Sequence, residues 1–450
     1  MRTLDIFRDT LGLDNDLKPF PAEDDLTLEQ KEALSVLNSG ANVFLTGGAG
    51  TGKSFLINRF KALNKGKSIL LTAPTGIAAQ QIGGATLHRT FKIPSNMLSP
   101  HEQQKHVKAI SSLLRSTDIV IIDEISMCRE DVFTYVVRFI AQENLRRGRT
   151  EKKAPIQLIC VGDFFQLPPV ITNSERECWR ELWGNSEGFA FQSKAWEYMQ
   201  IKTIALTEVV RQKDNAFATA LNNIRLNNES GLDYLNNNRS PDEIEDAIFL
   251  CSKNQKADDI NYLRLQELDG DEYEFKMEKN DPNKVIKRSD LVCDEVLSLK
   301  EGARVMLLVN DYAGAYQNGS FGTVVKIMSD EIMVLLDTSR VVVSIKPHKW
   351  TIFDYELGES EDGRKVVVPL EKASYTQFPL KLAYAITIHK SQGQTYDSVN
   401  IDVQDIFANG QLYVALSRCR SIQNTYFNMP LTTSKLKVSK TVLEQYRMAS

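Results

Sequence analysis

Several features that would direct the chain to a membrane, to secretion or to a structural metal are missing. No apolar run in the 450 residues approaches the roughly 20 residues that span a bilayer. The N-terminus carries Asp5, Asp9, Asp14 and Asp16, which suits neither a secretory signal nor a transit peptide. The six cysteines have neither close pairing nor the spacing of zinc ligands. We therefore expect buried, reduced thiols in a cytoplasmic protein without a membrane partner.

An excess of charge of either sign is also missing. The formal net charge is −4, and the hydrophobic and charged fractions of 42% and 25% are those of an ordinary globular protein. A binding site for a polyanion must therefore be a local groove and not a whole basic face. The length exceeds what one hydrophobic core supports and indicates about three domains.

The most informative stretch that is present is a glycine-rich loop at residues 47–54. It follows a short apolar strand at 42–46 and precedes an apolar helical pattern that begins at Phe55. A glycine-rich turn between strand and helix would need neither Lys53 nor Ser54, so we interpret the loop as a phosphate-binding loop. Lys53 would neutralise the β- and γ-phosphates, and the Ser54 hydroxyl would hold Mg²⁺. The expected nucleotide-binding residues of the loop are Gly47, Gly48, Ala49, Gly50, Thr51, Gly52, Lys53 and Ser54.

Further apolar strands end in polar residues, as in a parallel α/β sheet whose ligand site lies along one edge. Strand 118–122 leads to Asp123 and Glu124, which would hold Mg²⁺ through water and activate the attacking water, respectively. Strand 157–161 leads to a loop in which Gln166 could reach the γ-phosphate. Taken singly, the two carboxylates could be a surface turn, and Gln166 could be merely solvated.

The pattern of predicted secondary structure changes in the second half of the chain. Short β-rich runs at 304–309, 322–328, 331–336 and 340–345 predict a small antiparallel barrel. After Pro379 the α/β pattern returns, so the barrel is expected to be inserted into a second α/β domain.

Six collinear motifs resemble those of superfamily one helicases of the B type, and most closely those of the Pif (petite integration frequency) family, with RecD and Dda helicases as more distant relatives. Besides the phosphate-binding loop, the motifs are residues 72–76, 123–127, 162–169, 387–393 and 413–418. The resemblance covers residue 26 to about residue 428. It implies two RecA-like domains, a small wedge insertion and a Src-homology-type β-barrel.

The resemblance also implies domain boundaries and residue roles. The expected parts are an N-terminal arm (1–24), a first RecA-like domain (25–177) with a wedge insertion at about 92–106, a second RecA-like domain (178–255 and 376–432), an inserted domain with the barrel (256–375) and a C-terminal tail (433–450). Gln30, which local sequence reads as a capping-box residue after Thr27, would recognise adenine. Gly393 would contact the nucleotide. Arg211 and Arg418 would stabilise the γ-phosphate, with Arg418 facing Lys53 across the cleft, although any single arginine could form only a surface ion pair.

A groove for single-stranded DNA needs contacts to the backbone and flat surfaces for bases. Two motifs, one from each RecA-like domain, supply hydroxyls, backbone amides, cations and rings, whereas a lone histidine is more often structural. The expected DNA contacts are Pro74, Thr75, Gly76, His88, Phe91, Thr387, His389, Lys390 and Ser391.

Together these features predict an ATP- and Mg²⁺-dependent helicase, monomeric in solution, that moves 5′ to 3′ on single-stranded DNA and unwinds forked or structured DNA. The direction comes from the resemblance. Two alternatives remain open at this point: a DNA-stimulated ATPase that remodels protein–DNA complexes without strand separation, and a nucleotide-gated binding module or small-molecule kinase.

Overall fold

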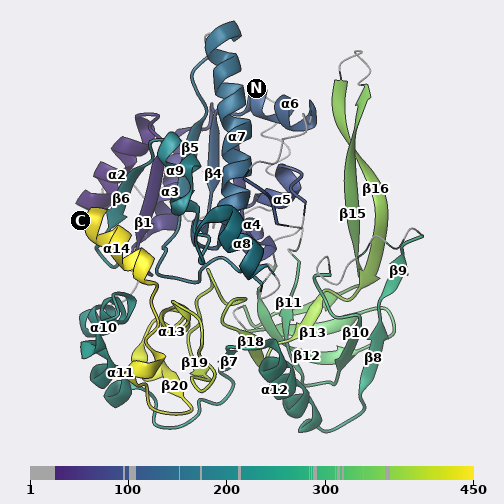
Figure 1. The fold of residues 1–450 in the computed structure, drawn as a ribbon. Helices are drawn as coiled ribbons and strands as arrows, with labels where there is room; N and C mark the ends of the chain where they lie inside the picture. Colours follow the sequence, from purple (N-terminus) through teal and green to yellow (C-terminus); the bar gives the residue numbers. More distant parts are fainter. Residues whose placement is uncertain are drawn as a thin grey trace, which may run out of the picture.

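The structure is a computed structural model (Figure 1) that describes residues 26–94, 97–100, 108–151, 153–172, 175–210, 214–282, 284, 286, 291–309, 311, 315–316, 319–337, 339–359 and 365–449. The expected N-terminal arm, Arg211 and most of the expected wedge insertion lie outside these residues. Among the helices of the described ranges, none is long and apolar enough to cross a membrane.

The first lobe is built on a parallel sheet with the strand order β3-β2-β4-β5-β1-β6. Its strands are β1 (Val43–Gly47), β2 (Ile69–Ala73), β3 (Ala85–Thr86), β4 (Ile119–Ile122), β5 (Gln157–Val161) and β6 (Lys202–Leu206). β1, β4 and β5 are buried along their whole length, which explains their continuous apolar runs. Because β4, β5 and β1 are neighbours, the motifs that follow them meet at one edge of the sheet.

Helices on both faces cover this sheet and form two cores. They are α2 (Leu28–Asn38), α3 (Lys53–Leu63), α4 (Gly76–Gln81), α5 (Leu87–Thr90), α6 (Lys108–Ser116), α7 (Glu130–Arg146), α8 (Arg176–Trp183) and α9 (Lys194–Tyr198). α2 and α3 pack with one face of β1, whereas Phe133 and Val136 of α7 pack on the other side of the sheet.

The first lobe extends beyond residue 177, where its boundary was expected. β6 pairs with β1 over five residues, and Phe189 and Met199 are buried in the same core as α7. The boundary was misplaced because β6 is half exposed and lacks the apolar run of the other strands. The lobe therefore continues at least to Leu206.

The second lobe has a smaller parallel sheet with the order β18-β7-β19-β20. Its strands are β7 (Ile248–Cys251), β18 (Ala385–Thr387), β19 (Val399–Ile401) and β20 (Thr425–Phe427), and its helices are α10 (Asn215–Arg225), α11 (Leu232–Asn238), α12 (Asn254–Gln266) and α13 (Gln411–Leu416). Two parallel α/β sheets in one chain confirm the predicted fold class.

An antiparallel domain interrupts the second lobe between β7 and β18. Four strands of its five-stranded sheet, β11 (Arg304–Leu307), β12 (Phe321–Ile327), β13 (Ile332–Leu336) and β14 (Val342–Ile345), fall in the predicted runs, and the fifth is β17 (Leu380–Leu382). Val305 pairs with Leu382, so the inserted domain extends beyond residue 375, its predicted end. The remaining strands are β8 (Tyr273–Lys276), β9 (Glu278–Asn280), β10 (Val296–Leu299), β15 (His348–Glu359) and β16 (Lys365–Gln377). β15 and β16 form the long hairpin at one side of Figure 1, which the sequence did not predict.

The C-terminal segment, for which the sequence suggested no partner, returns to the first lobe. Helix α14 (Lys440–Ala449) lies against that lobe in Figure 1, whereas Leu431 and Leu436, shortly before it, pack in the second lobe. Val442 is buried in the first lobe's core, and the Tyr446 ring meets Phe165 edge to face at 5.4 Å. The chain therefore crosses between the lobes twice, once after β6 and once before α14.

Candidate nucleotide site and nucleic-acid groove

The loop after β1 has the backbone conformation of an anion-binding loop. Gly50 and Gly52 have φ values of 80° and 85°, in the left-handed region that favours glycine, and α3 begins directly after them at Lys53. A Cβ atom on Gly52 would lie 2.6 Å from Nε2 of Gln30. The loop amides and the N-terminus of α3 thus face the same space, which suits a phosphate group.

Lys53 is held by the loop itself. Its Nζ atom donates to the carbonyl oxygens of Gly47 at 2.7 Å and Gly48 at 3.0 Å. Burial lowers the pKa of Lys53, while the nearby carboxylates of Asp163 and Glu124 act in the opposite direction. The amino group is therefore already positioned at the loop, among the acidic residues of the neighbouring strand ends.

Gln30 has both a capping contact and a contact with the phosphate-binding loop. Its backbone N–H donates to Thr27 Oγ1 and its Oε1 accepts from the Thr27 N–H, which completes the predicted capping box. Nε2 donates to the Thr51 carbonyl at 3.3 Å. Recognition of adenine by Gln30 stays a prediction.

Asp123 and Glu124 lie at the end of β4, beside the loop. Burial and the negative charge of Glu124 raise the pKa of Asp123 to about 7, and Asp123 Oδ1 accepts the Glu124 N–H at 2.9 Å. Glu124 has a φ of 50°, which is uncommon for a residue with a side chain. The exposed Ser54 hydroxyl and the Asp123 carboxylate are hard oxygen donors, and they fit a Mg²⁺ ion that takes its other ligands from phosphate and water. Within the described ranges, no cluster of three or more His, Cys, Asp or Glu side chains offers an all-protein metal site.

A glutamine of the second lobe, Gln392, contacts residues that follow both β4 and β5 of the first lobe. Its Nε2 atom donates to Glu124 Oε2 at 3.1 Å and lies 3.4 Å from Gln166 Oε1. The side chain is buried, and its Oε1 atom has no hydrogen-bond partner among the residues that the structure describes. We did not predict this residue, although it directly precedes the predicted nucleotide contact Gly393. Gln166 thus lies beside Gln392, and its contact with the γ-phosphate stays a prediction.

A buried ion pair that the sequence did not predict connects the lobes behind the phosphate-binding loop. Asp163, at the end of β5, accepts from Nε and Nη2 of Arg225, both at 2.9 Å, and both side chains are almost fully buried. The Arg225 guanidinium lies 4.3 Å from the centre of the Phe165 ring and 5.6 Å from that of Tyr446. The bidentate geometry and the two rings fix α10 of the second lobe against the loop that follows β5.

Arg418 is turned into its own lobe. It is 3% exposed, and its guanidinium donates to the carbonyls of Val414, Ser391 and Gln394 at distances of 2.9 to 3.4 Å. The expected position opposite Lys53 is therefore not the one that this structure shows, because the second lobe's own carbonyls bind the guanidinium. Gly393, with a φ of 78°, lies in the exposed turn after Gln392.

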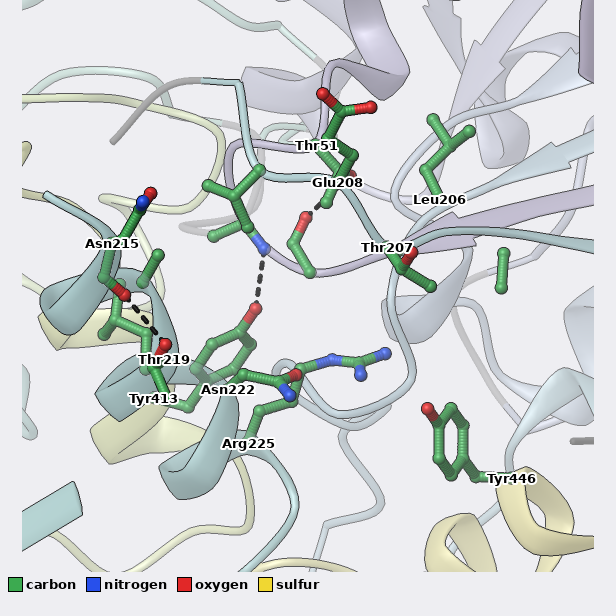
Figure 2. Close-up of a pocket in the computed structure, with 17 residues that line it drawn as sticks. Thr51, Leu206, Thr207, Glu208, Asn215, Thr219, Asn222, Arg225, Tyr413 and Tyr446 are labelled. Atoms are coloured by element: carbon green, nitrogen blue, oxygen red, sulfur yellow. Dashed lines mark hydrogen bonds between the residues drawn. The ribbon is translucent and has the colours of Figure 1, made fainter. Parts of the chain in front are cut away.

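A cavity of about 480 Å³ lies next to the phosphate-binding loop, between the two lobes. Figure 2 shows the Tyr413 hydroxyl pointing at the loop, with Arg225 and Tyr446 on one side and Asn215 and Thr219 of α10 on the other. The Ala49 N–H donates to the Tyr413 hydroxyl at 2.7 Å. The cavity wall therefore includes five separate parts of the chain: the loop, the segment 205–209 at the end of β6, α10, α13 and α14.

A larger cavity of about 1,220 Å³, lined in part by Glu124, lies between both lobes and the inserted domain. Of the predicted DNA contacts it is lined by Thr75, Gly76, His389 and Lys390, and the basic Lys381 is added from β17. Burial lowers the pKa of both His389 and Lys390. Glu124 and Gln392 line this groove as well, so the groove and the nucleotide residues share a wall.

Three predicted DNA contacts are buried instead. Phe91 is 0% exposed and packs 6.4 Å from the ring of Phe139, because α7 covers it. Ser391 is 0% exposed and donates its hydroxyl to the Ile388 carbonyl, and Thr387 is 6% exposed. These side chains shape the turn and the core and present no surface to a nucleotide base. His88 is exposed and Pro74 is half-buried, so both stay predictions.

The fold and the site define a two-lobed P-loop protein of the class that binds a nucleoside triphosphate at the lobe interface. The family described as PIF1-like helicase matches residues 25–230. The chain is 36% identical to the ATP-dependent DNA helicase PIF1 of Xenopus laevis, over 90% of this chain and 61% of that protein. It is 35% identical to the ATP-dependent DNA helicase Pif1 of Bdellovibrio bacteriovorus, over 90% of this chain and 88% of that protein.

Solved structures agree with this relationship. A crystal structure of Bacteroides Pif1 bound to single-stranded DNA matches with a TM-score of 0.73 and 33% identity, over 94% of this chain and 96% of that one. A structure of Bacteroides Pif1 with ADP-AlF4 matches with a TM-score of 0.74, 32% identity and the same coverage. The chain therefore belongs to the PIF1-like helicases, a family of ATP-dependent DNA helicases, which confirms the predicted resemblance.

Proposed function

We propose that this chain hydrolyses ATP with Mg²⁺ to move 5′ to 3′ along single-stranded DNA and to unwind duplex or structured DNA. The observation that carries the proposal is the position of Glu124, which lies between the phosphate-binding loop and the groove and is bonded to Gln392 of the second lobe. The relatives' names, and the Bacteroides structures with single-stranded DNA and with ADP-AlF4, support both substrates.

In this proposal, residues of the first lobe hold the nucleotide and prepare the attacking water. Lys53 binds the β- and γ-phosphates, Ser54 and Asp123 hold Mg²⁺, and the ion neutralises phosphate charge when it is bound. Glu124 accepts the proton of the water that attacks the γ-phosphate, and Gln166 orients that water. Charge then builds on the γ-phosphoryl group, and Arg418 and Arg211 are proposed to stabilise it.

Movement follows from closure of the cleft. ATP binding would draw the second lobe toward the first, and loss of the γ-phosphate would release it. Arg418 must leave the carbonyls of Ser391 and Gln394 to reach the phosphate. Because Ser391 directly follows His389 and Lys390, release of its carbonyl by Arg418 would alter the position of these two groove residues. Each cycle would then shift the contacts with DNA between the lobes.

The oligomeric state and the compartment are part of the same proposal. We propose a monomer in solution, and the cytoplasm as its compartment because the substrate is DNA and the six cysteines are unpaired. Binding to DNA should weaken as salt rises, since cations of the groove neutralise some phosphates.

The decisive test is ATP hydrolysis with and without single-stranded DNA, on the wild type, Arg418→Ala and the matched control Arg420→Ala, which removes an exposed arginine two residues away. DNA should stimulate the wild type and Arg420→Ala strongly, and stimulation should vanish in Arg418→Ala. Equal rates with and without DNA in the wild type would overturn the proposal.

Two further variants separate chemistry from binding. Lys53→Ala and Glu124→Gln should both abolish turnover, while Lys53→Ala keeps part of the DNA affinity. Normal turnover in Glu124→Gln would refute its role as base. A product assay on a forked duplex then separates a helicase from a translocase that remodels protein–DNA complexes, because only the helicase releases a free strand.

A further inference from the structure

The Tyr413 hydroxyl binds a backbone amide of the phosphate-binding loop. The Ala49 N–H donates to this hydroxyl at 2.7 Å, which is a short bond for N–H to oxygen. Tyr413 belongs to α13 of the second lobe, and its side chain is 2% exposed. A side chain of the second lobe therefore occupies a backbone N–H donor of the phosphate-binding loop, which belongs to the first lobe.

The surroundings of Tyr413 keep its hydroxyl protonated and directed. The hydroxyl donates toward Asp163 Oδ2 at 3.4 Å, and Asp163 is itself fixed by Arg225. Burial, together with the negative charge of Asp163, raises the pKa of Tyr413. A neutral hydroxyl that donates to Asp163 has its oxygen lone pairs free to accept from Ala49, which is the acceptor role that a phosphate oxygen plays in such a loop.

The start of α13 is seated firmly against the first lobe. Gly410, at the N-cap of α13, has a φ of 71°, and a Cβ atom there would lie 2.3 Å from the Gln166 carbonyl oxygen and 2.4 Å from that of Phe165. α13 is followed directly by Ser417 and Arg418. A shift of α13 would therefore move both Tyr413, which it carries, and Arg418, which follows it, relative to the loop that carries Gln166.

We propose that Tyr413 is a positioning residue that acts as an internal competitor for the phosphate site: its hydroxyl takes the Ala49 N–H until a nucleotide phosphate displaces it. Displacement frees α13 to turn and lets Arg418 leave its carbonyl partners. The contact thus links occupation of the loop to the position of the second lobe, and it resists closure onto an empty loop. The inference rests on the proposed nucleotide role of the loop, and it does not depend on DNA or on strand separation.

Equilibrium binding of a fluorescent ADP (N-methylanthraniloyl-ADP) to the full chain, without DNA, tests the competition. Tyr413→Phe removes the acceptor and keeps the ring, so ADP should bind about fivefold tighter, which corresponds to one hydrogen bond of about 1 kcal/mol. The matched control is Tyr384→Phe, because the Tyr384 hydroxyl also accepts a backbone N–H, that of Arg304 at 2.9 Å, away from the loop. Its affinity for ADP should equal that of the wild type. Unchanged or weaker binding to Tyr413→Phe overturns the proposal.

A second measurement needs no destabilising change. 3-Fluorotyrosine placed at position 413 reports the surroundings of the hydroxyl by ¹⁹F NMR. ADP should shift the resonance, whereas adenosine, which has no phosphate, should leave it in place. A resonance that ADP does not move, or that adenosine moves equally, would contradict the competition. Failure of DNA to stimulate hydrolysis would instead refute the proposed helicase function and would leave these two results unaffected.

Discussion

Gln392 of the second lobe donates to the carboxylate of Glu124 in the first lobe at 3.1 Å, although 268 positions separate the two residues in the sequence. Gln392 follows His389 and Lys390, which line the groove. It therefore connects the residues expected to bind DNA to the residue expected to activate water. In a motor, such a contact is a direct route by which DNA could change the rate of hydrolysis.

Removal of this amide should uncouple DNA from hydrolysis. We expect Gln392→Ala to lower the DNA-stimulated kcat about tenfold, because a hydrogen bond to a charged group contributes about 1.5–3 kcal/mol. ADP affinity should not change, since Gln392 does not line the cavity at the phosphate-binding loop. Steady-state hydrolysis over a range of DNA concentrations measures the effect, with Gln404→Ala as an exposed control. Full DNA stimulation in Gln392→Ala would refute the connection.

His389 and Ser391 should differ in their effect on DNA binding, although both were predicted contacts. His389→Ala removes a ring from the groove, so the DNA concentration for half-maximal stimulation should rise about tenfold, in line with about 1–3 kcal/mol for one stacked base. Ser391→Ala alters a side chain that is 0% exposed, and DNA affinity should stay within about twofold. Equal effects of the two substitutions would show that the groove is placed incorrectly.

Alanine substitutions at Gly410 and Gly184 distinguish the cost of backbone strain from the cost of a steric clash. Both have a φ of 71°, so alanine brings a similar cost of about 1–2 kcal/mol at either position. Only at Gly410 would the new Cβ meet backbone atoms, whereas none lies within 4 Å at Gly184. Gly410→Ala should therefore lower the free energy of unfolding by about 1–3 kcal/mol more than Gly184→Ala does, measured by urea denaturation. Equal shifts would contradict the tight seating of α13.

Because of Glu130, the free energy of unfolding should depend on pH near neutrality. Burial raises its pKa from 4.5 to about 7, and Asn185 donates to its carboxylate at 2.5 Å. For an acid with a raised pKa, ionisation costs stability, so the cost is absent below about pH 4.5 and grows up to about pH 7. Glu130→Gln should therefore gain stability relative to the wild type as pH rises from 5 to 8, on the order of 2–3 kcal/mol. Urea denaturation at both values measures this, and the exposed Glu177→Gln should show no such trend.

The sequence predicted the parts of the fold that depend on local pattern. Buried parallel strands appear as continuous apolar runs, and the polar motifs at their ends come together because the strands are neighbours. β6 and β17 were assigned to the wrong domain, because a half-exposed or three-residue strand does not reveal its partner. The hairpin β15–β16 was missed although the sequence between its strands contains Asp362-Gly363, a dipeptide typical of hairpin turns.

At the site, residues set by a local motif were predicted, whereas those whose surroundings depend on distant segments were not. Lys53 and Asp123 lie in short motifs whose geometry is set by one strand and one turn. Phe91 was placed in the groove because its motif is there, yet α7, which is distant in the sequence, covers it. Arg225 sits within a helix and matches no motif, so only its contact with Asp163 shows its importance.

The return of α14 to the first lobe restricts how the enzyme can move. The second lobe is attached to the first at two separate points of the chain, after β6 and before α14, and Phe165 and Tyr446 are in contact at the second one. A body held at one point can swing in any direction, but a body held at two can turn only about the line that joins them. We therefore expect the cycle to be a rotation about one axis, so that each ATP displaces the DNA along a single fixed direction.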